Sequence, residues 1–220
     1  MPMKNVPRQL AFSVYVTLLL TSTAYATTVT VDRGNIMVVD NNGFARQLTT
    51  TGLDASPALS FDKQRVVFVR RTPQKKVMTG AGEATADQLW MVNLDGTSPH
   101  MLVEGHEDDD PKRTLAALDT PVFSPDGRSV YFTSAAWATS GAIHAIVAAG
   151  GKERFVTDGN SLTVVPSGRY AGSLIVSKHK YWLAGGSYNW FWLVTPSGEE
   201  KGAVGPDENS IAAFMDMYAK

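Results

Sequence analysis

Residues 120–132 read TPVFSPDGRSVYF, and this stretch contains the pattern on which the fold prediction rests. A short apolar strand ends at Phe123, a turn follows at 125–127, and a second apolar strand begins at Val130. Proline fixes φ at the start of such a turn, and glycine accepts the left-handed conformation at its end. The stretch is therefore predicted to be two antiparallel strands joined by a tight turn.

The same module recurs on both sides of this stretch. It appears at 56–69 as SPALSFDKQRVVFV and, in a degraded form, at 163–176 as TVVPSGRYAGSLIV. A second kind of hairpin alternates with it, and its turn glycines follow one another at intervals of 53, 54 and 48 residues; they are Gly43, Gly96, Gly150 and Gly198. A repeat of about 50 residues is typical of the blades of a β-propeller.

The motif Phe-Ser-Pro-Asp-Gly-Arg at 123–128, followed by an aromatic-rich strand and an Asp-Gly hairpin, resembles the repeat of TolB-like and prolyl-oligopeptidase-type propellers. The resemblance covers nearly all of residues 28–205 and is strongest in the second copy. It implies an all-β fold, a small β-propeller of four blades with four antiparallel strands each. We expect the propeller alone, without TolB's N-terminal domain or a hydrolase domain.

Closure of the ring is expected to involve both ends of the chain. The predicted strand at 27–32 corresponds to the second strand of a blade. The first blade therefore lacks its first strand. The segment 210–215 is predicted to be the strand that fills this place, which would leave no free edge in that blade. Because four blades are at the low end of the usual range, an open or oligomer-completed partial propeller is the alternative.

The N-terminus has the three parts of a secretory signal peptide. Lys4 and Arg8 precede an apolar run of 11 residues at 10–20, and Ala24-Tyr25-Ala26 gives the small-residue cleavage pattern. A membrane anchor is the alternative, but spanning a bilayer takes about 20 residues. We therefore expect a signal peptide at 1–26, a propeller at 27–220 that does not span the membrane, and a periplasmic or secreted location.

The composition excludes several classes of function. The chain has no cysteine, so disulfides, thiol catalysis and thiolate metal sites are excluded. Without Lys4 and Arg8, 18 basic residues stand against 21 acidic ones, and no basic block is present. Binding to nucleic acid or to an anionic membrane surface is therefore not expected.

The candidate binding residues lie in two connections that occupy the same position in adjacent repeats. The first connection, at 134–141, surrounds Trp137 with small residues. The second, at 177–190, carries four further candidates, which are His179, Tyr181, Tyr188 and Asn189. Because equivalent connections lie at the same end of a propeller, we expect these five residues to form one recognition surface. The alternative is that the aromatic residues only seal the blade ends.

Two insertions interrupt the repeat. Residues 70–87 are expected to form a long, flexible loop that begins with basic residues. The other insertion, at 104–111, contains four consecutive acidic residues, Glu107, Asp108, Asp109 and Asp110. Such carboxylates repel one another unless water, a cation or a basic partner neutralises them. Calcium is a weak candidate because it prefers oxygen ligands, but the spacing is not that of an EF-hand. A solvated acidic loop is the alternative, and no other cofactor is expected.

The sequence favours binding over catalysis. It contains no G-x-S-x-G nucleophile motif, and its four histidines are scattered without ligand spacing. The resemblance implies a non-catalytic propeller that binds a protein or an envelope component through loops at one end. A small-ligand or glycan-binding propeller is the alternative, followed by a hydrolase with an unrecognised site.

Overall fold

The computed structural model describes residues 26–220, so the predicted signal peptide lies outside the described residues apart from its last position. Four antiparallel sheets follow one another along the chain. The first contains β1 (Thr28–Asp32), β2 (Asn35–Val39) and β3 (Ala45–Gln47). The second contains β4 (Asp54–Leu59), β5 (Arg65–Arg70), β8 (Gln88–Asn93) and β9 (His100–Glu104).

The other two sheets each have four strands. The third contains β10 (Asp119–Phe123), β11 (Ser129–Ser134), β12 (Ala142–Val147) and β13 (Arg154–Asp158). The fourth contains β14 (Ser161–Val164), β15 (Leu174–Tyr181), β16 (Ser187–Val194) and β17 (Glu200–Gly205). The remaining elements are the hairpin β6 (Lys76–Thr79) and β7 (Gly82–Thr85), the short 3-10 helix η1 (Gly168–Tyr170) and the helix α1 (Glu208–Tyr218). Neither helix within 26–220 is long and apolar enough to cross a membrane.

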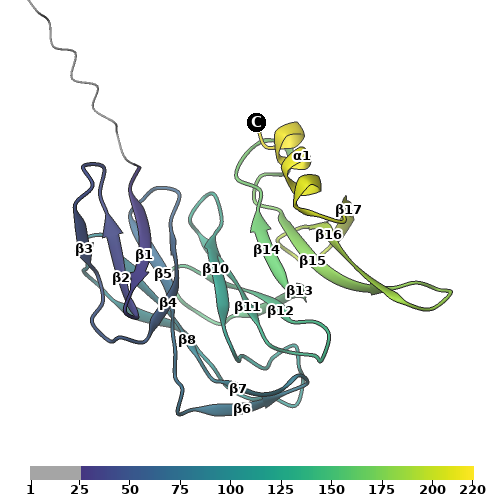
Figure 1. The fold of residues 1–220 in the computed structure, drawn as a ribbon, viewed down its shortest axis with the longest axis horizontal. Coiled ribbons are helices and arrows are strands. Elements are labelled where there is room, and N and C mark those ends of the chain that lie inside the picture. Colours follow the sequence, from purple (N-terminus) through teal and green to yellow (C-terminus); the bar gives the residue numbers. More distant parts are fainter. Residues whose placement is uncertain (1–25) are drawn as a thin grey trace, which may run out of the picture.

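The sheets are arranged as propeller blades along an arc (Figure 1). The inner strands of consecutive sheets contact each other, β1 with β4, β4 with β10, and β10 with β14. Buried apolar side chains fill each space between neighbouring sheets, with Phe68 between the first two, Phe132 between the next two and Leu174 between the last two. Removing these faces from water is the main favourable contribution to the fold.

The two copies of the sequence module that are not degraded, at 56–69 and 120–132, adopt the same local structure. Ser60 donates to Asp62, and Ser124 donates to Asp126, so each turn is closed by the same side-chain hydrogen bond. Upstream of each turn, a residue before proline has a positive φ, +48° at Ser56 and +47° at Thr120, where the strand register shifts. The predicted strand, turn and strand are therefore confirmed in both copies, and the register shift in each first strand is a further shared feature that was not predicted.

The prediction for residues 210–215 is wrong, because they belong to α1 rather than to a strand. Asp207 caps this helix by accepting a hydrogen bond from the backbone N–H of Ser210. Ile211, Phe214 and Met215 share one helical face and pack against the fourth sheet. Within residues 26–220 the first sheet consequently has three strands, and no strand pairing joins it to the fourth.

The first insertion is also more ordered than the predicted flexible loop. It forms the β6–β7 hairpin, and Arg71 at its base binds Asp87 at 2.9 Å and Asp119 of the third sheet at 3.0 Å. At its tip, the N–H of Gly80 donates to the carbonyl of Ala136 at 2.7 Å. The hairpin therefore bridges the same end of the second and third sheets.

His144 is fully buried, and its two ring nitrogens have no hydrogen-bond partner. Its ring stacks on Phe132 at 5.5 Å and meets Phe155 edge-on at 6.0 Å. Burial, and to a smaller extent the charge of His106, lowers the pKa of His144 from 6.5 to about 4. The imidazole therefore acts as a neutral packing group at neutral pH, at the repeat position that Trp90 and Trp192 fill elsewhere.

We predict that replacing Phe214 by alanine lowers the free energy of unfolding by about 2 kcal/mol, because the ring packs against Tyr170 and Tyr218 over the end of the fourth sheet. Met217→Ala on the same helix should cost less than about 0.5 kcal/mol, since that side chain is 68% exposed. Urea denaturation of both variants measures the difference. Equal losses would contradict the role of α1 as a cover.

We predict that stability falls with acidification between pH 6.5 and about 4 because of His144. The unfolded chain binds a proton at 6.5 and the folded chain only near 4, so unfolding takes up a proton in this window. The loss should reach roughly 3 kcal/mol at the lower limit. Chemical denaturation across this range should show a smaller pH dependence for His144→Phe. An unchanged dependence would contradict the assignment.

Candidate functional site

The β15–β16 hairpin projects from the end of the fourth sheet. The two strands pair over eight residues each, from Leu174 with Val194 to Tyr181 with Ser187. Their neighbours cover only the base, because β14 pairs with residues 174–177 and β17 with residues 191–194. The outer half of the hairpin consequently extends beyond the sheet, at the end of the molecule opposite the first sheet (Figure 1).

One buried lysine fixes the base of the hairpin to the third sheet. The side chain of Lys178 is 1% exposed, and its ammonium group donates to Asp158 at 2.8 Å, Thr157 at 2.6 Å and Glu200. Lys180 donates to the same Glu200 carboxylate at 2.9 Å. Partial burial raises the pKa of Glu200, but the hydrogen bonds and charges of the two lysines outweigh burial and lower it. Glu200 therefore stays ionised at neutral pH, and its ion pairs with the two lysines orient the hairpin.

The predicted site residues on this hairpin are divided between its two faces. His179, Tyr181 and Asn189 lie on one face, where the imidazole and the Asn189 side-chain oxygen are 2.8 Å apart and the Tyr181 ring lies edge-on at 5.0 Å. Tyr188 lies on the other face, stacked on Trp182 at 4.2 Å and edge-on to Trp190 at 5.6 Å. Successive residues of a strand point to opposite faces, which explains the division.

Trp137 does not join this group of residues. It lies in the β11–β12 connection, half-buried, with its ring edge-on to Phe155 at 6.2 Å. Its side chain therefore continues the aromatic packing around His144, as the sealing alternative expected. The structure thus brings four of the five predicted residues onto one hairpin and places the fifth against the third sheet.

The tip of the hairpin is apolar and exposed. Tyr181 is 68% exposed, Trp182 53% and Leu183 110%, so Leu183 has no cover at all. The turn is closed by two hydrogen bonds, from the N–H of Trp182 to Gly186 and from the N–H of Gly185 to Trp182. Gly185 and Gly186 have positive φ, which lets the chain reverse shortly after these three apolar residues.

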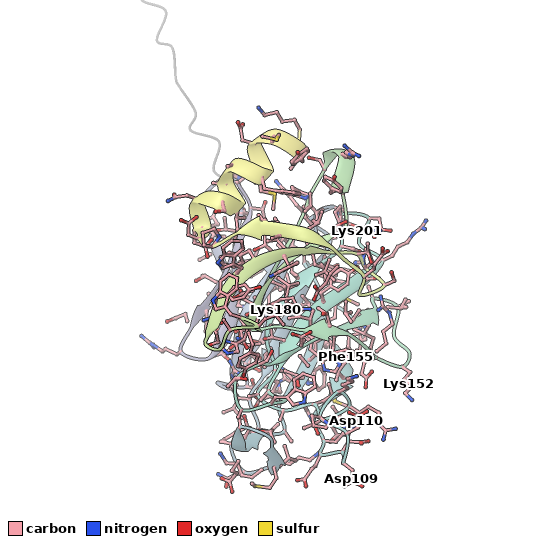
Figure 2. All side chains as sticks on the ribbon, turned by 90° about the vertical axis from the view of Figure 1, so that its right-hand side faces the viewer. Asp109, Asp110, Lys152, Phe155, Lys180 and Lys201 are labelled. Carbon is pink, nitrogen blue, oxygen red and sulfur yellow. The ribbon has the colours of Figure 1, made fainter. Side chains whose placement is uncertain are left out.

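The four acidic residues lie away from the hairpin. Figure 2 looks onto the hairpin side and shows Asp109 and Asp110 below Lys180 and Phe155. Asp108 binds Arg113 at 3.0 Å, and Glu107 accepts from the N–H of Met78 at 2.7 Å. The N–H of Asp110, followed by the charge and hydrogen bond of Arg113, lowers the pKa of Asp108. Within residues 26–220, no group of three or more His, Cys, Asp or Glu could hold a metal ion.

A groove lies between α1 and the edge of the fourth sheet. The groove has a volume of about 520 Å³ and is lined mainly by apolar side chains, among them Leu193, Val204, Phe214 and Met217. The sequence did not predict this groove, because the segment that forms one wall was expected to be a strand. The sequence also did not identify Trp182 and Leu183 as exposed residues, although Gly185-Gly186 shortly after them indicates a turn there.

No protein-family model matches the sequence, and no curated protein matches it. Among solved structures, the chain is similar to TolB from Acinetobacter baumannii, with 16% identity and a TM-score of 0.54, over 82% of this chain and 40% of that one. Dipeptidyl peptidase 4 from Porphyromonas gingivalis gives 12% identity and a TM-score of 0.56, over 82% and 31%. The propeller domain of the Trilobed protease from Pyrococcus furiosus, which has an open velcro topology, gives 11% and 0.50, over 80% and 52%.

These identities are low, so the similarity describes the fold alone. The chain spans less than half the length of the first two structures. Consecutive antiparallel sheets joined through their inner strands account for the match. The chain therefore has a TolB-like β-propeller fold.

Proposed function

We propose that this chain is an exported, non-catalytic binding protein whose contact element is the β15–β16 hairpin. The observation that supports this most is the exposed apolar tip. A soluble domain gains nothing from holding a leucine, a tryptophan and a tyrosine in water beside each other, and such groups mark interaction sites. The partner is a protein or another component of the envelope.

The rigidity of the hairpin supports the same proposal. The buried Lys178 fixes its base, and the Trp182–Tyr188 stack fixes its outer half. A preorganised tip loses little conformational entropy when it binds, so more of its contact energy contributes to affinity. Tryptophan and tyrosine are also the residues that most often dominate binding energy.

Export is part of the proposal because of the pattern in residues 1–26 and the TolB-like fold of the remainder. The glycan-binding alternative is less well supported. It requires Trp137, Tyr181 and Tyr188 to share one concave surface, whereas Tyr181 and Tyr188 point to opposite faces of the hairpin. A binding role needs none of these residues to act as an acid, a base or a nucleophile.

We predict that a photo-crosslinking amino acid at Ala184, in the hairpin turn, captures a discrete envelope component in intact cells. The same group at Phe44, which is 74% exposed at the opposite end of the molecule, should capture none. The double variant Trp182→Ala, Leu183→Ser should weaken capture from position 184 at least tenfold. Its global thermal unfolding should change little, because both side chains are more than half exposed and the Trp182–Tyr188 stack that is lost supports only the outer half of the hairpin.

Gel analysis of the crosslinked adducts measures the result. Equal capture from positions 184 and 44 would contradict the proposal, as would unchanged capture by the double variant.

A further inference from the structure

We propose that the envelope component contacted by the hairpin is the lipid bilayer itself, and that the tip at 181–187 inserts into its interfacial layer. This inference rests on the proposed function, since it takes the hairpin as the contact element. The tip reads YWLAGGS and contains no Asp, Glu, Lys, Arg or His. Seven consecutive residues without these side chains can enter the interface without desolvating an ion.

The side chains at the tip are of the types that occur at a membrane–water interface and at the edge of the hydrocarbon layer. Leu183 lies in the turn and is fully exposed, so it can enter the hydrocarbon boundary without rearrangement. Tyr181 and Trp182 stand beside it with 68% and 53% exposure, and each combines an apolar ring with a polar group. Tyrosine and tryptophan concentrate at membrane–water interfaces for this reason.

The backbone limits insertion to the turn. Within the turn, the N–H groups of Trp182 and Gly185 are already bonded to carbonyls of the turn itself. The strands behind it lack neighbours at 178–181 and 187–190, so their outward N–H and C=O groups need water. Unsatisfied backbone groups are costly in hydrocarbon, and the tip therefore reaches the interface but not the bilayer centre.

The charges behind the tip predict how binding responds to lipid charge. The nearest ammonium groups, Lys178 and Lys180, are already paired with Glu200 and Asp158. They are therefore not free to attract anionic headgroups. Binding should depend on apolar burial, with little sensitivity to salt or to headgroup charge, in contrast to a polybasic membrane site.

The convex shape of the tip favours a lipid surface over a protein pocket. The β15–β16 hairpin projects as a narrow loop (Figure 1), and Leu183 in its turn is fully exposed. A protein hot spot is usually surrounded by a rim of further contacts that exclude water. A bilayer needs no such complementary rim.

The test uses the full chain with two kinds of vesicle, phosphatidylcholine alone and phosphatidylcholine mixed with phosphatidylglycerol. We expect co-sedimentation with both, little changed by salt. Leu183→Asp should lower the partition coefficient about tenfold or more, given the loss of one buried leucine. Phe44→Asp is the matched control, because it places the same charge on an exposed apolar residue at the other end, and it should bind normally.

Brominated lipids give a second measurement that does not depend on folding of the Asp variant. They should quench part of the tryptophan emission of the wild type, and Trp182→Phe should remove this quenching while binding persists. Three results would overturn the inference: no vesicle binding, equal loss in Leu183→Asp and Phe44→Asp, or binding only to anionic vesicles at low salt. If vesicles fail but position 184 still crosslinks to a protein, the bilayer proposal is wrong and the proposed function stands; if both fail, both are wrong.

Discussion

The burial of sheet faces is the constraint on which the rest of this structure depends. Each inner sheet is covered by a neighbour on both faces, so Val67, Phe132 and Ile143 are completely buried. In a row of four sheets without strand pairing between its ends, the first and the fourth sheet each have one face that no other sheet in residues 26–220 covers. Such a face must either be covered by another element or carry polar side chains. At the fourth sheet α1 covers Val165, Ile175 and Leu193, whereas the outward face of β1 is polar, with Thr28, Thr30 and Asp32. Both solutions resemble the terminal caps of repeat proteins.

The same constraint accounts for the position of the candidate site. Because α1 and β17 cover only the base of the last sheet, β15 and β16 can continue beyond it without a neighbour. A two-stranded hairpin is marginally stable alone, and here the Lys178 cluster and the Trp182–Tyr188 stack support it. The most exposed apolar residues of the hairpin thus lie on an element held firmly at its base, which is the arrangement that a binding tip needs.

Local patterns in the sequence predicted most of the fold, because turn chemistry and short apolar strands are determined by neighbouring residues. The Ser-x-Asp turns at Ser60 and Ser124 are examples. The prediction of a closing strand at 210–215 was wrong because it followed from ring closure, while Asp207 and the spacing of Ile211, Phe214 and Met215 indicated a helix. The site was predicted only in part. Sequence alone cannot distinguish an exposed Leu183 from a buried one, since that depends on which neighbouring strand ends first.

The claim that the sheets form an arc without direct contact between the first and the last can be tested by distance measurement. Because the chain has no cysteine, spin labels can be attached to single introduced cysteines at Thr30 in β1 and Thr163 in β14. Pulsed electron–electron double resonance measures the distance between the two labels. We predict that this distance clearly exceeds the distance between labels on consecutive inner strands, such as β10 and β14. A separation as short as that of neighbouring strands would contradict it and would indicate a closed ring.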